Sequence, residues 1–234
     1  MRLMSRIYAN NVDADIRASL NVLIDNSTSV GQYKDAFVSL GYRLAERFMA
    51  EYQGSFDSRI TVAVTAEDAD YLAKGFIEKL EKSLDSKIFL ACFWNDHTKE
   101  SFTGRSIAPS ISEYLQPGYQ ESSELIVIKS IISGSCVVKS NILALYDRMS
   151  NISKVHVVAP VVFNEAENLL KSEFPEELAS KFDFTWFAKD SERKPDGEVV
   201  PGIGGQIYTR LGLKGKPHEF NYMPQSVVSR LISA

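Results

Sequence analysis

The sequence predicts an α/β fold in which a mainly parallel, twisted sheet is flanked by helices, and three observations support this prediction. Short runs rich in Val, Ile, Phe and Ala recur along the chain, as expected of strands that are buried on both faces. Stretches with apolar residues at helical spacing separate these runs. Turns of small and polar residues follow several of them. Strands that alternate with helices favour parallel pairing, with helices covering both faces of the sheet.

The first half of the chain contains two of the expected strands and two long helices. In each helix, charged residues separate the apolar side chains, so that one face can pack on a core. The second helix begins with acids and ends with lysines, as the helix dipole favours. The expected elements are a helix over 32–52, the strand RITVAV from Arg59, a helix over 67–84 and the strand KIFLACFW from Lys87.

A long polar segment with Gly, Pro and Ser divides the two halves, and it is expected to form a flap or lid. The second half then repeats the alternation of strand and helix. Its expected elements are the strand ELIVIK from Glu124, a turn at 133–136, a helix over 137–148, the strand KVHVVAPVV from Lys154, a helix over 164–173 and the strand FDFTWF from Phe182, followed by a charged turn.

Composition argues against several functional classes. The 26 basic and 30 acidic residues give a net charge of −4, which provides no overall attraction to nucleic acid or to an anionic membrane. No apolar run is long enough for a membrane span or a signal peptide, so a cytoplasmic protein is expected. Cys92 and Cys136 lack the spacing of a zinc site, and the three histidines lack metal-site partners, so no metal ligand is assigned.

Three loops are expected at the carboxyl edge of the sheet, where parallel α/β sheets bind their ligands. These loops are Thr65–Asp68, Trp94–His97 and Ser133–Cys136. The last of them opens a helix with small residues, and such a loop can hold a phosphate with its backbone amides. It lacks the Gly-Lys-Ser/Thr of a nucleoside triphosphate loop, which argues against ATP or GTP hydrolysis by that route. An ordinary turn of small residues is the alternative interpretation.

Three further groups have both a chemical and a structural interpretation. Cys136 stands at the expected start of a helix, where the dipole lowers a thiol pKa, although a small buried side chain is the simpler explanation. The acids Glu67, Asp68 and Asp70 are either helix-start residues or catalytic groups at the ligand edge. The segment VPGIGG, over Val200–Gly205, suits a backbone that approaches a flat ligand closely, and it is equally compatible with a turn.

The order of these segments resembles the uracil phosphoribosyltransferase family of type I phosphoribosyltransferases. The segment ITVAVTAEDADYLAKGF looks like the family's pyrophosphate-loop strand and helix, and IFLACFWNDHT looks like its next strand and flap start. LIVIKSIISGSCVVKSNILALYDR takes the place of the loop that binds phosphoribosyl pyrophosphate (PRPP), and DGEVVPGIGGQIYTRLG resembles the base-binding segment. The resemblance implies transfer of a phosphoribosyl group from PRPP to a pyrimidine or related base, with Mg²⁺.

The resemblance also implies a domain plan and a set of site residues. One phosphoribosyltransferase-like domain covers 1–234, with an N-terminal arm (1–33) that commonly builds a homodimer, a flap hairpin (95–123), and a C-terminal hood segment with the base-binding residues and tail (189–234). The implied phosphate-loop residues are Lys129, Ser133, Gly134, Ser135 and Cys136; the pyrophosphate-loop position is Thr65, Ala66 and Glu67; the flap residues are Trp94, Asp96 and Arg105; and the base-binding residues are Val200, Pro201, Gly202, Ile203 and Gly204.

The departures from the family pattern concern charged groups. The family carries arginines where Thr65 and Trp94 align, an Asp near Lys129, and an acid where Gly205 stands. The Thr-Gly-Gly-Ser pattern of its PRPP loop is reduced here to Ser133–Cys136. Lys129, Lys99 or Arg105 could supply a cation from a different position. No catalytic residue is assigned.

Three hypotheses follow. The first is an active phosphoribosyltransferase with divergent contacts, which would use Mg²⁺. The second is a phosphoribosyltransferase-like protein with a degenerate PRPP site that binds a nucleotide, base or sugar phosphate and serves as a regulatory or effector subunit for a protein partner. Diverged members of this kind occur in bacterial defence systems. The third is an unrelated α/β enzyme that uses Cys136 or the acids around Glu67. The second hypothesis is preferred because the apolar frame and the glycines persist while charged groups are replaced.

Overall fold

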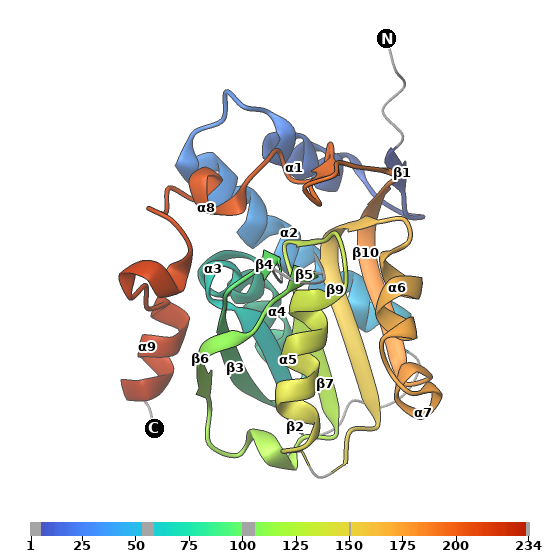
Figure 1. The fold of residues 1–234 in the computed structure, drawn as a ribbon, viewed down its shortest axis with the longest axis vertical. Helices are drawn as coiled ribbons and strands as arrows, with labels where there is room; N and C mark the ends of the chain where they lie inside the picture. Colours follow the sequence, from blue (N-terminus) through green and yellow to red (C-terminus); the bar gives the residue numbers. More distant parts are fainter. Residues whose placement is uncertain (1–5, 53–58, 100–105, 150, 233–234) are drawn as a thin grey trace.

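The computed structural model describes residues 6–52, 59–99, 106–149 and 151–232 (Figure 1). The predicted flap residue Arg105 lies outside these ranges. A central sheet runs through the molecule in the order β1-β10-β9-β7-β2-β3-β6. Its strands are β1 (Arg6–Tyr8), β2 (Arg59–Thr65), β3 (Lys87–Asn95), β6 (Ser110–Leu115), β7 (Glu124–Ile128), β9 (Lys154–Phe163) and β10 (Phe182–Asp190), and the short β8 (Ile131–Ile132) also pairs with β9.

The sheet is parallel in its centre and antiparallel at both edges. Strands β10, β9, β7, β2 and β3 pair in parallel, whereas β1 pairs antiparallel with β10 and β6 pairs antiparallel with β3. The central strands are almost continuously buried because helices cover both of their faces. The predicted class, a mainly parallel sheet flanked by helices, is confirmed.

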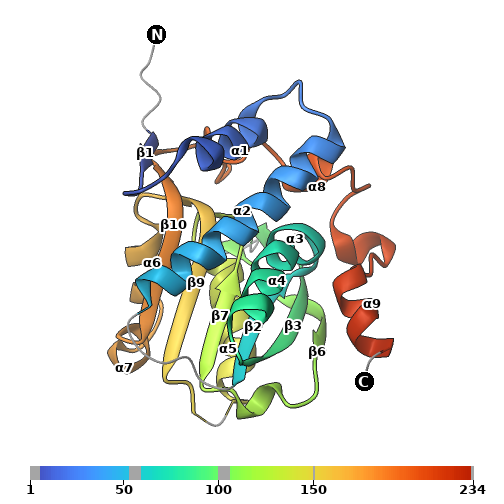
Figure 2. The same cartoon turned by 180° about the vertical axis from the view of Figure 1, so that it is seen from behind.

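Helices lie on the two faces of this sheet. Figure 1 shows α5 (Cys136–Tyr146), α6 (Ala166–Ser172) and α7 (Glu176–Ala179) in front of it. Figure 2 shows the opposite face, covered by α2 (Val30–Glu51) and by a helical run made of α3 (Ala66–Asp68), the π-helical turn η1 (Ala69–Ala73) and α4 (Lys74–Ser83). One apolar cluster lies under each set of helices, so the sheet separates two cores.

The carboxyl edge of the sheet is covered by segments from both ends of the chain and from its middle. They are α1 (Ala14–Ile24), the hairpin of β4 (Thr98–Lys99) and β5 (Ser106–Ile107), the hairpin of β11 (Glu192–Arg193) and β12 (Val199–Val200), and α8 (Ile207–Arg210). The chain then continues through η3 (Pro217–Phe220) to α9 (Gln225–Ile232) at the side of the sheet (Figure 1). In the described ranges, no helix is both long and apolar enough to cross a bilayer.

Two segments differ in detail from the sequence-based expectation. The 95–123 segment forms the β4–β5 hairpin, but its later residues join the main sheet as β6 and continue into the turn η2 (Tyr119–Glu121). The charged turn expected after FDFTWF begins later, because β10 continues to Asp190. Its last residues gain a partner that the local pattern does not indicate, since β1 pairs with Ala188–Asp190 from the other end of the chain.

Candidate functional site

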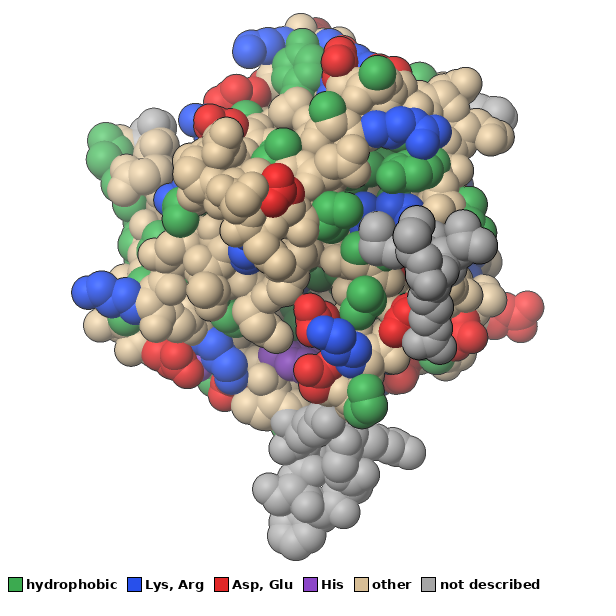
Figure 3. Space-filling model, turned by 90° about the horizontal axis from the view of Figure 1, so that it is seen from above, with side chains coloured by type: hydrophobic (Ala, Val, Ile, Leu, Met, Phe, Trp, Pro, Cys, Tyr) green, Lys and Arg blue, Asp and Glu red, His purple; other side chains and the backbone are tan. Residues whose placement is uncertain are grey.

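The three loops expected at one edge of the sheet do lie there. Strands β7, β2 and β3 are parallel neighbours, so the residues after each of them emerge at the same edge. Thr65–Asp68 follows β2, His97 follows β3, and Ser133–Cys136 follows β7 and β8. Figure 3 looks onto this edge, where basic and acidic side chains are interspersed and no face of a single charge stands out.

The 133–136 loop and the 200–205 segment line one cleft. Two adjoining cavities, of about 200 Å³ and 290 Å³, share a wall formed by Ser133, Gly134 and Cys136. Ile203 and Gly205 line the first cavity, and Glu67 and Lys129 line the second. Residues shared by both cavities are His97, Ile131, Ser133, Gly134, Cys136, Gln206 and Ile207. The 133–136 loop and the 200–205 segment, which the resemblance assigns to one site, are therefore close in space.

At the pyrophosphate-loop position, the polar groups bind one another. Thr65 ends β2, and its hydroxyl donates a hydrogen bond of 3.0 Å to Asp68 Oδ2. Both side chains are buried, and Ala66 beside them is fully buried. Glu67 extends from the first turn of α3 to the wall of the cleft. This turn thus offers a carboxylate, and no cation, to the cleft.

Lys129 closes a buried ion cluster with Glu67 and Asp68. Its ammonium donates to Asp68 Oδ2 at 2.6 Å and to Glu67 Oε1 at 3.0 Å, and the three side chains are at most 11% exposed. The backbone amide of Ser130 donates a further bond of 3.2 Å to Asp68. Burial alone lowers the pKa of the Lys129 ammonium, but the two adjacent carboxylates outweigh this effect and hold the pKa above its ordinary value. Lys129 is charged, and its charge is engaged within the protein.

The 133–136 loop, in contrast, has unused hydrogen-bond donors. Helix α5 begins at Cys136, and its N-cap Ser135 makes no side-chain cap bond. Among the described residues, the backbone amides of Gly134 and Ser135 have no acceptor. Free amides at the start of a helix suit an anion, since the helix dipole adds a positive potential at the same place. The loop therefore keeps the features that led to its prediction as a phosphate site.

Of the two interpretations of Cys136, the structure favours the buried side chain over the reactive thiolate. The thiol is half-buried in the wall of the cleft, and burial, which disfavours a thiolate, is the largest influence on it. Backbone hydrogen bonds from Val137 and Cys136 lower the pKa less than burial raises it, so the thiol pKa lies above its ordinary value. Cys92 is deeply buried in β3, and burial raises its thiol pKa as well. Neither cysteine has the character of an activated nucleophile.

The 200–205 segment is held by the protein's own backbone and side chains. The amide of Gly202 donates to Asp190 Oδ2 at 2.9 Å, and its carbonyl accepts a bond of 2.6 Å from Arg6. Arg6 and Asp190 also form a two-point pair, with both distances 2.7 Å. The carbonyl of Ile203 accepts a bond from the buried Tyr33 hydroxyl. These groups were expected to face a ligand, and they instead fix the segment in place.

The glycines of this segment have different tasks. Gly204 has φ +78°, and a Cβ atom on it would lie 2.1 Å from the carbonyl oxygen of Leu23, so close packing on α1 requires glycine there. Gly205 has φ +107°, and a Cβ on it would meet no atom within 4 Å. Only Gly205 therefore opens on the cleft in the manner expected of a backbone that approaches a ligand. The peptide bond between Val200 and Pro201 is cis.

Of the predicted flap residues, Trp94 lies away from the cleft. Its side chain is buried in the core under α2 and α4. There its Nε1 donates a bond of 2.7 Å to the carbonyl of Tyr222. Asp96 pairs with Lys216, and this hydrogen bond holds the pKa of the Asp96 carboxyl below its usual value. His97 lines both cavities, and burial lowers its pKa, with the nearby Lys216 adding to the effect. Of the described residues of the 95–123 segment, His97 and Ser106 line the cleft.

Sequence reasoning missed several residues of the cleft. Arg193, Gln206, Tyr208 and Lys216 all line it, and none of them belongs to a recognisable local motif. Burial raises the pKa of the Tyr208 hydroxyl, and the adjacent Glu67 raises it further, so this hydroxyl remains a neutral hydrogen-bond donor. Arg193 lies in the charged segment after β10, and only the folded hairpin brings it to the 133–136 loop.

The residues at the ion cluster do not fit a Mg²⁺ ion. Magnesium prefers carboxylate oxygens, but the carboxylates of Glu67 and Asp68 already share an ammonium within 3.0 Å. In the part of the chain that the structure describes, no group of three or more His, Cys, Asp or Glu side chains could hold a metal. The cleft thus offers binding through amides, hydroxyls and cations.

No model of a protein family matches the sequence, and no curated protein matches it either. Among solved structures, the adenine phosphoribosyltransferase from Leishmania donovani gives a TM-score of 0.48 at 11% identity, over 83% of this chain and 85% of that one. The AQ2163 protein from Aquifex aeolicus gives a TM-score of 0.60 at 14% identity, over 88% of this chain and 96% of that one. At this identity the likeness shows a shared fold alone: the chain has the fold of AQ2163 over most of its length.

Proposed function

We propose that this protein is a phosphoribosyltransferase-like binding protein, which holds a nucleotide or sugar phosphate in its cleft and does not transfer the phosphoribosyl group. Support comes from the order of the segments and from their convergence. The 133–136 loop and the 200–205 segment, which the resemblance assigns to phosphate and base, face one cleft. The free amides of the loop match a phosphate, and Gly205 leaves the backbone open beside it.

The observation that carries the proposal is the buried ion cluster of Lys129, Glu67 and Asp68. In phosphoribosyl transfer the departing pyrophosphate gains negative charge, which cations or a metal must stabilise. Here the corresponding turn presents carboxylates, and the cluster contains one more acidic than basic side chain. It would repel a pyrophosphate group, and its single cation is already engaged.

The free energy that two arginine contacts to pyrophosphate would contribute is large enough to decide between binding and turnover. A charge-assisted hydrogen bond to a phosphate contributes about 1.5–3 kcal/mol, which corresponds to roughly 10- to 100-fold in affinity. The family's two arginine positions are Thr65 and Trp94 here, and both side chains are buried in contacts with the protein. Stabilisation of the leaving group is therefore lost at two places, whereas the shortened 133–136 loop still has free backbone amides for the opposite phosphate.

A binding protein of this kind would act through what it recognises. We extend the proposal to a regulatory or effector role, in which a protein partner distinguishes the ligand-bound protein from the ligand-free protein. The homodimer implied by the resemblance belongs to the same proposal. Support for this extension is the retention of a cleft that has lost the groups needed for turnover.

The test compares binding with turnover on the same preparation. Titration calorimetry with ribose 5-phosphate and the four common nucleoside 5′-monophosphates should detect at least one ligand. Incubation with PRPP, Mg²⁺ and uracil should release no pyrophosphate above the background without protein. An active uracil phosphoribosyltransferase, assayed in parallel, serves as the positive control. Turnover at about 1 s⁻¹ or faster, the ordinary range of enzymes, would favour the active phosphoribosyltransferase and refute the proposal.

A further inference from the structure

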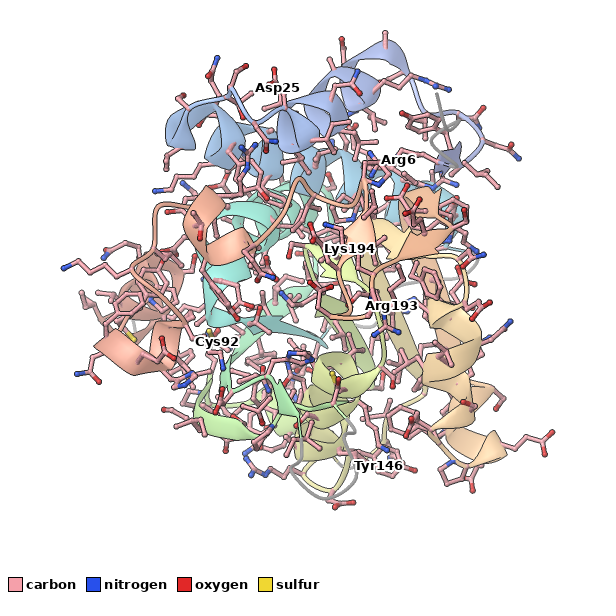
Figure 4. The ribbon with its side chains drawn as sticks, turned by 45° about the horizontal axis from the view of Figure 1, so that its top comes forward. Arg6, Asp25, Cys92, Tyr146, Arg193 and Lys194 are labelled. Carbon is pink, nitrogen blue, oxygen red and sulfur yellow. The ribbon has the colours of Figure 1, made fainter. Side chains whose placement is uncertain are left out.

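The hairpin of β11 and β12 places an arginine over the 133–136 loop. A methyl group on Gly134 would lie 3.3 Å from Arg193 Nη2 and 3.9 Å from its Cζ, so the guanidinium rests directly above this glycine. Figure 4 shows the Arg193 side chain reaching from the hairpin toward the amino end of α5. Arg193 and Ser133 line the same cavity of about 200 Å³. A cation therefore stands beside the free amides of the loop, on an element remote from it in sequence.

The terminal nitrogens of Arg193 are not engaged by the protein. Its Nε donates to the carbonyl of Gly197 at 3.4 Å, which orients the side chain within the hairpin. Among the described residues, Nη1 and Nη2 have no acceptor, and no carboxylate forms an ion pair with Arg193. The nearest acids on the hairpin are occupied: Asp196 accepts a bond from the amide of Glu198, and Glu198 pairs with Lys194.

We propose that Arg193 is a phosphate-binding residue of the cleft, and that the ligand carries a terminal phosphate monoester held between this guanidinium and the amides of the 133–136 loop. This inference rests on the proposed function. The fork of an arginine matches two phosphate oxygens, whereas a lysine acts as a point charge. The cation comes from the C-terminal hairpin, so it takes over a role that Thr65 and Trp94, now engaged elsewhere, do not fill.

A purely structural role for Arg193 leads to different expectations. The side chain is exposed, its single protein bond is long, and the Phe163 ring lies 5.8 Å from its Cζ. Removing such contacts changes stability little. If Arg193 only supported the hairpin, its loss would weaken nucleotide and nucleoside binding alike. If it binds phosphate, its loss would weaken only ligands that carry the phosphate.

The experiment uses the full chain and calorimetric titration with three kinds of probe: ribose 5-phosphate, nucleoside 5′-monophosphates and the matching nucleosides. Arg193→Gln should weaken binding of the phosphate-bearing ligands by roughly 10- to 100-fold, and Arg193→Lys by less. Nucleoside binding should be unchanged in both. Lys194→Gln is the matched control, since it removes the same charge from the next residue, which pairs with Glu198 and does not line the cavity.

The outcomes separate this inference from the proposed function. If the unmodified protein binds phosphate-bearing ligands and Arg193→Gln binds them equally well, the role of Arg193 is refuted while the proposed function stands. If the unmodified protein binds none of them at millimolar concentration, the proposed function fails and this inference fails with it. Equal affinities for ribose 5-phosphate and the nucleotides would identify a sugar-phosphate ligand, and tighter nucleotide binding would identify a nucleotide. In both cases the role of Arg193 is supported if Arg193→Gln weakens binding of that ligand and refuted if it does not.

Discussion

The two sides of the cleft use their charged groups in opposite ways. On the side of β2, Lys129 neutralises Glu67 and Asp68 in a buried cluster. On the side of the 133–136 loop, the backbone amides of Gly134 and Ser135 and the terminal nitrogens of Arg193 have no partner among the described residues. The charged groups on the first side are buried and paired with one another, whereas the donors on the second side are available to a ligand. Under the proposed function, one side would bind a phosphate and the other would give no stabilisation to a leaving group.

The largest expected effect concerns the buried side. Lys129→Met leaves two carboxylates buried beside each other without a cation, and loss of one partner of a buried ion pair typically costs about 3–5 kcal/mol. Urea unfolding followed by circular dichroism measures this loss of stability. The triple variant Lys129→Met, Glu67→Gln, Asp68→Asn should recover most of it, because no charge is then left unpaired. A loss below about 1 kcal/mol for Lys129→Met would contradict the buried cluster.

A second pair of variants tests how the 200–205 segment is held. Gly204→Ala combines a positive φ with a clash against the carbonyl of Leu23, whereas Gly205→Ala has a positive φ and open space. Backbone strain alone costs about 1–3 kcal/mol, so both variants should lose stability and Gly204→Ala should lose more. Thermal unfolding ranks the two. The reverse ranking would show that Gly204 does not pack on α1 in this way.

The smallest effect concerns Cys136, in the wall shared by both cavities. Because burial raises its thiol pKa, less thiolate is present at pH 7 than in a free thiol, and labelling should be slow. The rate should rise with pH, with a midpoint above the ordinary thiol value. Iodoacetamide labelling followed by mass spectrometry measures this rate, and Cys136→Ser identifies the labelled site. Labelling at neutral pH faster than a small free thiol would contradict the raised pKa and revive a nucleophilic role.

The general architecture could be predicted from the sequence because it depends on local patterns. Apolar runs such as those of β2, β3 and β9 are too continuous for a sheet with one wet face, and the helices between them imply parallel strands. Parallel strands in turn bring their following loops to one edge, which is why the Thr65–Asp68 and Ser133–Cys136 loops could be placed together. The place of the 200–205 segment beside them was anticipated only from the family resemblance.

The details of the site depend on pairings that no local pattern contains. Lys129 is separated by 61 residues from Asp68, although both stand at the ends of strands that pair side by side. A lysine after one strand and acids after its neighbour were therefore a usable signal. Trp94 gave no comparable signal, because the face of β3 on which it lies was not determined by the sequence around it. Arg193 reaches the cleft only because the hairpin folds back over α5.

The segments over 200–210 that border the cleft are held by residues near the other end of the chain. Arg6 donates hydrogen bonds to the Asp190 carboxylate and to the carbonyl of Gly202. Arg210 donates to the carbonyls of Leu23 and Asp25. During synthesis, the N-terminal side of these contacts must wait for partners that emerge almost 200 residues later. The cavity is consequently finished among the last parts of the molecule, and a ligand that fits it stabilises only completely folded chains.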